Sequence, residues 1–286
     1  MKIKLIKGEI MSCKTGNSYI TKKGDTLSSI AQQQLHSSDR WHEILKPDGT
    51  PFREEDAHNL QVGQEICIPH SGNRNTGGST GDGFANIVSH QAYKTMFPNH
   101  NDFYTYESLI TAVKKYPHFC NEGSLQQRKR EASAFLANIS HETGGLHYIQ
   151  EQNPQSHYCD ATNTTYPCVA GKSYHGRGPI QLSWNYNYGA CGKAIGKDLL
   201  NHPELVSTNN VISFTTALWF WMTPQPPKAS CHKAISTSGF GMTINIINGG
   251  IECGKGPQTP QAEHRIQLYK HFTEVLNVTP GDNLSC

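Results

Sequence analysis

The spacing of apolar residues predicts helices along most of the C-terminal part of the chain. Within residues 106–116, Leu109, Ala112 and Val113 recur on one helix face, and Pro117 follows, where a helix cannot easily continue. Similar apolar stripes predict further helices over residues 124–143, 211–222 and 262–276. The segments between them are long and rich in Gly, Pro, Asn and Tyr, which is typical of loops around a substrate cleft.

The predicted helix over residues 124–143 has clear signals at both ends. The hydroxyl of Ser124 can cap its first turn, and Gln127 stands where a capping partner is expected. Gly144 and Gly145 end the helix, because glycine readily adopts the left-handed conformation of a helix C-cap. The apolar stripe between these ends consists of Ala132, Phe135, Leu136 and Ile139.

The N-terminal part of the chain carries a pattern of two short strands and two helices. The predicted elements are a strand at 19–21, a turn at Gly24-Asp25, a helix with Leu27, Ile30 and Ala31 that Thr26 caps, a helix with Trp41, Ile44 and Leu45 that Pro47 ends, and a strand at 65–69. A unit of about 50 residues has a thin core. Cys13 and Cys67 flank it and could staple it.

Composition changes abruptly at residues 71–83 (SGNRNTGGSTGDG), where Gly, Ser, Thr and Asn dominate and nothing apolar is present. Such a segment is typical of a flexible linker. We therefore expect a small domain at residues 1–70, a linker at 71–85 and a large domain at 86–286.

Charge and cysteine content narrow the function classes. The net charge of +2 comes without a cluster of Lys and Arg, so we expect no nucleic-acid partner. No stretch of about 18 apolar residues indicates a membrane span. Nine cysteines favour an oxidising destination, although the first residues (MKIKLIKGEIM) lack the apolar core of a usual signal peptide. We expect an extracellular or exported protein with an unknown export route.

Glu142 is the most informative residue of the sequence. Phe135, Ile139 and Glu142 stand at positions i, i+4 and i+7 of the predicted helix, so the carboxyl lies on the apolar stripe. Burial beside aliphatic groups raises the pKa of a carboxyl, which suits a general acid. The alternative is a cap partner or a member of a buried ion pair.

A second carboxyl, Glu151, follows nine residues later. Its neighbours are polar, so we expect this side chain to be ionised. One carboxyl with a raised pKa and one solvated carboxylate form the pair that glycoside hydrolysis needs. The turn at Gly144 and Gly145 permits the chain to fold back, so that both groups can face one glycosidic bond.

Residues 174–188 (YHGRGPIQLSWNYNY) interleave hydroxyls, amides and aromatic rings. Aromatic faces stack on sugar rings, and amides bind hydroxyl and acetamido groups. This composition favours a carbohydrate-binding segment. The alternative is a polar loop with structural tyrosines.

The small domain resembles the LysM family, whose modules bind N-acetylglucosamine glycans of chitin or peptidoglycan. The matching residues are Tyr19-Ile20, Gly24–Leu27, Ile30-Ala31, Leu60, Val62–Gln64 and Ile66–Pro69. Between Lys46 and His58 the chain departs from the family pattern with a longer, charged segment. The resemblance implies glycan binding by residues 1–70, and a spacer domain that binds nothing is the alternative.

The large domain resembles the family 19 glycoside hydrolases. The matching motifs, in the family's order, are HETGG at 141–145, the segment 174–188, WFWMT at 219–223 and NIINGGIECG at 245–254. The resemblance implies an inverting endochitinase. It also implies an α+β, mainly α-helical chain, in which a lysozyme-like catalytic domain follows a small βααβ LysM-like domain.

The resemblance implies a role for each matching residue. Glu142 resembles the general acid, Glu151 the general base, and Ser183 the residue that holds the attacking water. Positions implied to bind substrate are Gln181, Tyr174, Tyr186, Asn187, Lys228, Asn248 and Arg265, the last of which also forms a charged network with Glu252 behind the acid. Between the two glutamates, residues 147–149 stand in place of the longer, cysteine-containing segment of plant members, as in the shorter bacterial members. This implies fewer subsites than in plant members.

The resemblance also implies two disulfides, Cys159 with Cys168 and Cys253 with Cys286. The pairs Cys13 with Cys67 and Cys191 with Cys231 follow by elimination alone and leave Cys120 unpaired, so the sequence does not decide these links.

We expect neither a cofactor nor a metal. His141 and His147 lack the spacing of a zinc-protease helix, and the sequence holds no CxxC pair and no phosphate-binding Gly-rich loop after a strand. Disulfides explain the cysteines better than a cysteine nucleophile does. The expected partners are chitin and chitooligosaccharides, with peptidoglycan as an alternative, bound by a monomer that contacts no membrane.

Two other functions are open at this point. A peptidoglycan-cleaving muramidase, acting as an endolysin or antibacterial effector, is compatible with the LysM-like module and with the unusual N-terminus. A non-catalytic chitin-binding lectin would use the scaffold without its chemistry. The long plant-like motifs favour chitin over peptidoglycan, and the presence of Glu142, Glu151 and Ser183 favours an enzyme over a lectin.

Overall fold

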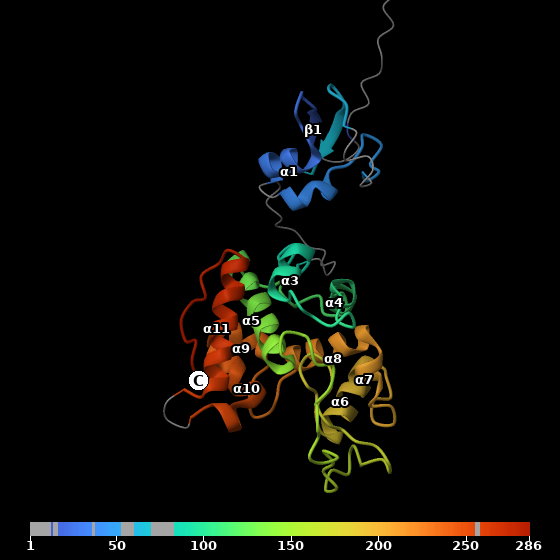
Figure 1. Ribbon diagram of the computed structural model, residues 1–286, viewed down its shortest axis with the longest axis vertical. Helices are drawn as coiled ribbons and strands as arrows, with labels where there is room; N and C mark the ends of the chain where they lie inside the picture. The colour runs from blue at the N-terminus through green and yellow to red at the C-terminus, as the bar shows by residue number, and fades with distance from the viewer. Residues whose placement is uncertain (1–12, 14–16, 36–37, 53–59, 70–82, 255–257) are drawn as a thin grey trace, which may run out of the picture. The chain divides into compact units, whose positions relative to one another are not determined.

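The structure of the protein is a computed structural model that describes residues 13, 17–35, 38–52, 60–69, 83–254 and 258–286. The chain forms two compact units, Met1–Gly77 and Gly78–Cys286 (Figure 1). Most of the predicted linker, residues 71–82, lies outside the described residues.

The smaller unit is a two-stranded sheet with helices on its apolar face. Strand β1 (Asn17–Ile20) pairs antiparallel with β2 (Glu65–Ile68), and α1 (Leu27–Leu35) and the 3-10 helix η1 (Ser38–Glu43) lie between them in sequence. Its core consists of Leu27, Ile30, Ala31, Leu35, Ile44, Phe52, Ile66 and Ile68. The Cys13–Cys67 disulfide joins the chain before β1 to β2, as the flanking positions of the two cysteines suggest.

The second predicted helix of this unit is wrong in extent. Trp41 lies in η1, but the backbone of Leu45 exchanges hydrogen bonds of 3.0 and 2.8 Å with that of Cys67 in β2. Leu45 is therefore extended against the sheet and cannot be helical. Its apolar neighbour Ile44 still fills the core, which explains why the sequence pattern looked helical.

The larger unit is mostly helical, as predicted. One group of helices packs around α5 (Leu125–Thr143) and includes α9 (Cys231–Thr237), α10 (Phe240–Glu252) and α11 (Pro260–Val275), with α3 (His90–Met96) against α11. A second group packs against α8 (Asn210–Met222) and includes α4 (Tyr106–Val113), α6 (Asn185–Ile195) and α7 (Leu205–Thr208). Among the described helices, none is both long and apolar enough to span a membrane.

Both ends of α5 have the capping residues that the sequence predicts. Ser124 and Gln127 form a reciprocal capping box, and Gly144 takes a left-handed conformation with φ of 61° at the C-cap. The segment 174–188, in contrast, is only partly a loop, because α6 begins at Asn185. The glycines of α6 and α10 hide their helical character from a search for apolar spacing.

The cysteine pairing differs from one of the predicted links. The structure contains the Cys159–Cys168 and Cys253–Cys286 disulfides, as the family resemblance implies. The Cys191–Cys231 pair is wrong, since both thiols are free and buried. Cys191 belongs to α6 and Cys231 to α9, in the two different helix groups, so pairing by elimination had no spatial basis. Cys120 is also free and buried.

A buried carboxylate holds α5, α8 and α9 together away from the sequence-predicted site. Glu131 of α5 accepts hydrogen bonds from the Trp221 indole at 3.0 Å, the Cys120 backbone N–H at 3.0 Å and the His232 ring Nδ1 at 2.6 Å. The other ring nitrogen of His232 lies 3.2 Å from a carboxylate oxygen of Glu122. The hydrogen bond to Glu131 raises the pKa of His232, although burial opposes it.

We expect this contact to stabilise the fold at mildly acidic pH. Because the pKa of His232 is raised in the folded state, its stabilisation is complete below the unfolded value of about 6.5 and fades as the pH rises through the folded value. His232→Gln should lose roughly 1.5–3 kcal/mol of unfolding free energy near pH 5.5, because it loses a charged hydrogen bond. Urea unfolding across pH 5–9 measures the difference.

The matched control is His202→Gln, because His202 also contacts a glutamate, Glu204, but its side chain is 59% exposed. That substitution should change stability by no more than about 0.5 kcal/mol. A loss in His232→Gln that stays constant from pH 5 to 9 would refute the charged contact.

Candidate active site

Glu142 lies in the last turn of α5, where the helix ends at an open surface. Its side chain is 18% exposed, so it is largely but not wholly removed from water. The turn is fixed by Thr143, whose hydroxyl donates to the Ile139 carbonyl at 2.6 Å and accepts the Leu146 N–H at 2.8 Å. The backbone that carries the carboxyl is therefore rigid.

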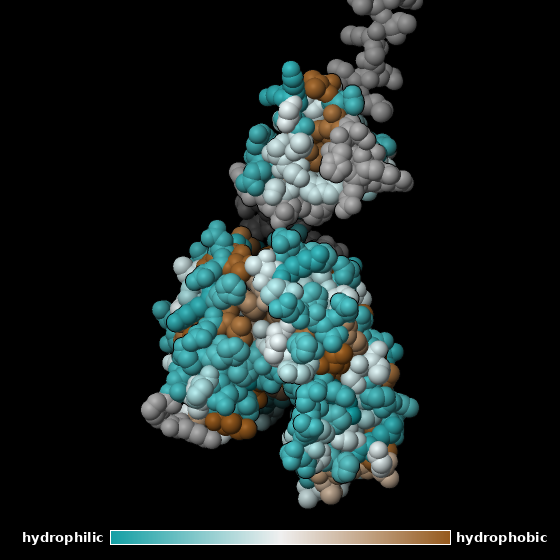
Figure 2. All heavy atoms as spheres, viewed as in Figure 1, coloured by the Kyte–Doolittle hydropathy of each residue, from teal (hydrophilic) through white to brown (hydrophobic). Residues whose placement is uncertain are grey.

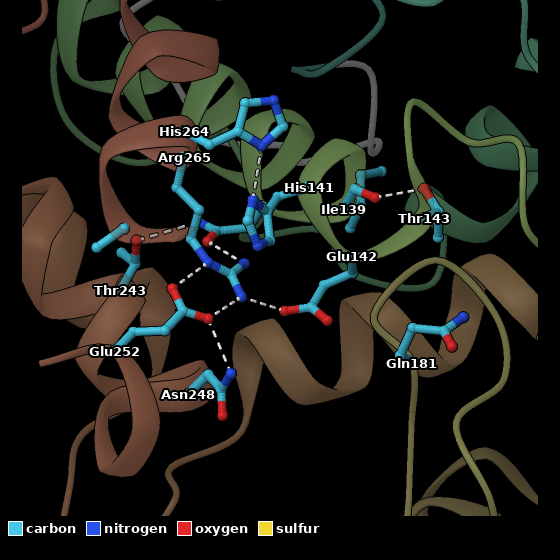
Figure 3. A network of polar contacts seen from close by, with 12 residues as sticks. Ile139, His141, Glu142, Thr143, Gln181, Thr243, Asn248, Glu252, His264 and Arg265 are labelled. Atoms are coloured by element: carbon cyan, nitrogen blue, oxygen red, sulfur yellow. Dashed lines mark hydrogen bonds and ion pairs between the residues drawn. The ribbon is translucent and has the colours of Figure 1, made fainter. Parts of the chain in front are cut away.

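A buried guanidinium holds Glu142 from behind (Figure 3). Arg265 of α11, with a side chain 1% exposed, donates to Glu142 and to both carboxylate oxygens of Glu252, at 2.8 and 2.9 Å. Its remaining nitrogen donates to the Asn138 amide oxygen at 3.0 Å. The planar fork of arginine suits such shared binding, because its donors point in fixed directions.

The two carboxyls on this guanidinium have opposite pKa shifts. Burial raises the pKa of Glu142, and this outweighs the lowering by Arg265; the negative charge of Glu252 raises it further. Burial also acts on Glu252, but its hydrogen bonds and ion pair with Arg265 prevail and lower its pKa. One carboxyl can therefore carry a proton while its neighbour is ionised, as in sites that use carboxyls in different roles.

A kink in α10 adds one more residue to the network around Arg265. Asn248 leaves the helical conformation, with φ of −144°, and its amide donates to Glu252 at 2.8 Å. Nearby, the Lys228 ammonium donates to the Asn245 carbonyl at 2.6 Å. The kink thus turns one amide toward the charged network, and the half-buried Lys228 is anchored to the same helix.

Glu151 is held by different means. Its two carboxylate oxygens accept hydrogen bonds from the Tyr158 hydroxyl at 2.7 Å and the Gly176 N–H at 3.3 Å. Its own backbone N–H donates to the Gly176 carbonyl at 2.8 Å, so two extended segments meet side by side. The side chain is half-buried, with no cation among these contacts.

Gly176 brings three predicted site residues together. A Cβ atom at this position would lie 2.8 Å from the Gln181 amide oxygen and 3.4 Å from the Ser183 hydroxyl oxygen, while the Gly176 N–H touches Glu151. A side chain here would displace them. Ser183 donates to the Gln181 carbonyl at 2.9 Å, and Asn187 donates to the Ser183 carbonyl at 2.9 Å.

These two sets of residues come from different parts of the larger unit. Figure 2 shows that unit hollowed between two lobes, of which one carries α10 and α11 and the other carries α6 and α7 (Figure 1). The Arg265 network belongs to the first lobe. In the view of Figure 3, Gln181 lies on the side of Glu142 away from Arg265.

Two aromatic residues of the segment 174–188 differ in their exposure to solvent. Tyr186 is half-buried and stacks on the exposed Trp184, with ring planes 12° apart. Tyr174 is fully buried, and its hydroxyl donates to the Leu200 carbonyl at 3.0 Å and accepts the Val169 N–H. The substrate-binding role expected for Tyr174 is therefore corrected to a structural one, because its ring has no exposed face.

Sequence reasoning missed several residues that support the site. Asn138, one turn before Glu142, is fully buried and binds Arg265; a polar residue on an apolar stripe was its available signal. Tyr158 gives no such signal, because only the folded loop brings it to Glu151. His141 contacts His264 of α11, with 2.9 Å between the ring nitrogens.

Within the described part of the chain, no three His, Cys, Asp or Glu side chains gather in a way that could hold a metal ion. The chemistry available from the described side chains is proton transfer between two carboxyls and a bound substrate or water.

Comparison with known proteins follows the same division of the chain. Residues 80–286 match the sequence profile of the family described as Chitinase class I, and residues 19–42 match that of the LysM domain. Endochitinase A2 of Pisum sativum is 43% identical over 256 residues, which cover 78% of each chain. Endochitinase 2 of Gossypium hirsutum is 46% identical over 239 residues, covering 71% of this chain and 78% of that one.

Solved structures of chitinases are also similar to this chain. Chitinase C from Streptomyces griseus HUT6037 is 48% identical, covers 70% of this chain and 97% of its own, and superposes with a TM-score of 0.67. The class IV chitinase from Zea mays, 41% identical, covers 70% and 98% with a TM-score of 0.64.

Because Glu142 and Glu252 share the Arg265 guanidinium, we expect the pKa of Glu142 to depend on the charge of Glu252. Glu252→Gln removes a negative charge that raises the pKa of Glu142 and leaves Arg265 with one carboxylate partner, so this pKa should fall. Carboxyl-carbon NMR titration of Glu142 measures the shift. Glu263→Gln, at an exposed position of α11, is the charge-matched control and should leave it in place. An unmoved Glu142 titration in Glu252→Gln would disprove the coupling.

Proposed function

The chain belongs to the family 19 glycoside hydrolases, the class I chitinases, and from this premise we propose that it hydrolyses internal β-1,4 linkages of N-acetylglucosamine chains in chitin. The observation that carries the proposal is the half-buried Glu142, whose pKa is raised although Arg265 binds it. A raised pKa makes a carboxyl hold its proton more strongly, which is what a general acid requires.

Glu142 acts as the general acid. It donates its proton to the glycosidic oxygen as the bond between that oxygen and the anomeric carbon breaks, and the bonding electrons go to the oxygen. Arg265 positions the carboxyl for this transfer and stabilises the carboxylate that is left. Glu252 in turn accepts hydrogen bonds from Arg265 and from the Asn248 amide, which holds the guanidinium in place.

Glu151 acts as the general base. It removes a proton from a water molecule, whose oxygen attacks the anomeric carbon from the face opposite the departing group. The Ser183 hydroxyl donates to the Gln181 carbonyl, so its own oxygen can accept a hydrogen bond from that water. The tyrosine and backbone contacts of Glu151 aim the carboxylate without a paired cation.

The substrate-binding roles are part of the same proposal. We propose that Gln181, Tyr186, Asn187, Lys228 and Asn248 bind hydroxyl and acetamido groups of the substrate. Arg265, with a side chain 1% exposed, acts through Glu142 instead of contacting the sugar as expected. Because the attack inverts configuration, a β-linked substrate yields an α-anomeric product. Inverting enzymes separate the two carboxyls by about 6.5–9.5 Å to admit the water.

The domain organisation fits an enzyme that works on an insoluble polymer. The chitinase and LysM domains imply binding of chitin and its oligosaccharides. We propose that residues 1–70 bind the polymer and residues 71–85 link them to the catalytic residues 86–286, which raises the local enzyme concentration. We further propose that the protein acts as a monomer outside the cell, since three disulfides suit an oxidising location.

The acid role has a direct test. Glu142→Gln keeps the shape of the side chain but cannot supply the proton, so hydrolysis of chitohexaose should fall by at least about 10²-fold, the usual contribution of general acid catalysis. Oligosaccharide binding, followed by calorimetry, should persist. Activity close to wild type in this variant would remove Glu142 from the mechanism.

The substrate has a separate test. We expect the wild type to cleave chitohexaose internally, with α-anomeric products at early times in a proton NMR assay, and to leave purified peptidoglycan intact. Release of fragments from peptidoglycan with no cleavage of chitohexaose would instead support a muramidase.

A further inference from the structure

A second groove, of about 510 Å³, lies beside the segment that carries Glu151. It is lined by residues 147–150 and Gln152, by Asn101, and by Ser207 and Thr208 at the end of α7. Glu142, Glu151 and Ser183 are not among the residues that line it, so it is distinct from the acid–base pair. Its volume falls within the roughly 300–1,000 Å³ of small-molecule sites.

Tyr148 provides an aromatic surface in this groove. Its side chain is exposed, at 46%, which is unusual for so large a ring. Its backbone is held at both ends, since its N–H donates to the Thr143 carbonyl at 2.9 Å and its carbonyl accepts the Tyr104 hydroxyl at 3.2 Å. Its ring lies close over Gly144 and meets the His147 ring edge-on, so it is positioned before any ligand arrives.

Amides and hydroxyls surround this ring. Gln152 donates to the Gln150 carbonyl at 2.9 Å, and within the described residues the Gln150 side-chain amide makes no hydrogen bond. Ser207 and Thr208 donate their hydroxyl protons to the Glu204 carbonyl, at 3.1 and 2.9 Å. Their oxygens keep lone pairs that can accept a hydrogen bond from a ligand.

The groove contains no formal charge from Lys, Arg, Asp or Glu among its lining residues. The lining therefore offers no permanent charge to a phosphate, a carboxylate or a cation, and its one imidazole, His147, packs against the Tyr148 ring. The chemistry that fits is an uncharged molecule with one apolar face and many hydroxyl and amide groups around its edge. A pyranose ring with an acetamido group has this form.

We propose that this groove is an accessory binding site for N-acetylglucosamine units, with Tyr148 as the stacking surface and Gln150 as a hydrogen-bonding partner. The inference rests on the proposed function for its choice of sugar. Because residues 147–150 lead directly into Glu151, a sugar bound here holds a stretch of polymer next to the catalytic base.

The test uses the full-length chain with Glu142→Gln, so that the ligand survives, titrated with chitotriose and followed by NMR. The Ile149 methyl group reports on the groove, the Trp184 indole N–H on the catalytic cleft and the Trp41 indole N–H on the LysM domain. We expect saturable shifts at Ile149. Adding Tyr148→Ala should weaken the affinity that Ile149 reports by about tenfold, equivalent to 1.4 kcal/mol.

Two further variants separate a binding role from a structural one. Tyr148→Phe keeps the ring face and should retain the affinity within about threefold, whereas Gln150→Ala should weaken it by roughly 2–10-fold through one lost hydrogen bond. The Trp184 shift should persist in all three, which also shows that the domain is folded.

The outcomes are distinguishable. If Trp184 shifts and Ile149 does not, or if Tyr148→Ala leaves the Ile149 affinity unchanged, the accessory site is refuted and the proposed chitinase activity is unaffected. If Trp184 and Ile149 both fail to shift and the wild type does not cleave chitohexaose, the proposed function fails and this inference with it.

Discussion

The polar network around Glu142 depends on one buried guanidinium. Arg265 is almost fully removed from water, and such a charge is costly unless it is paired and hydrogen-bonded. Glu252, Glu142 and the Asn138 amide meet this requirement from two neighbouring helices. The contacts that orient the Glu142 carboxyl therefore also fix α5, α10 and α11 relative to one another. A substitution of Arg265 would therefore change both the packing of these helices and the surroundings of the Glu142 carboxyl.

The Glu151 carboxylate is held without a cation among its hydrogen-bond partners. Glu151 is aimed by a tyrosine hydroxyl and by a glycine N–H, and the loop around Gly176 brings Gln181 and Ser183 beside it. Burial therefore dominates the surroundings of Glu142, whereas hydrogen bonds from neutral groups hold Glu151. The two carboxyls proposed as acid and base therefore lie in different surroundings.

Sequence patterns succeeded where burial and local geometry act together. The α5 helix, its capping box, its glycine end and the half-buried position of Glu142 all follow from residues within a few turns of one another. The sequence patterns gave wrong predictions where contacts with distant segments decide the conformation or environment of a residue. Leu45 pairs with β2 instead of continuing a helix, Tyr174 is taken into the core, and Cys191 and Cys231 belong to different helix groups.

The sequence alone determined the helical class and the family resemblance and predicted the two carboxyls, because periodicity and motif order are properties of the chain itself. Only the tertiary structure decided that Arg265 binds Glu142 and Glu252 at once, that Tyr158 holds Glu151, and that Cys191 and Cys231 are not joined. These contacts depend on distances between residues far apart in the chain, and hydrogen bonds and disulfides form only when folding brings their atoms within a few ångströms.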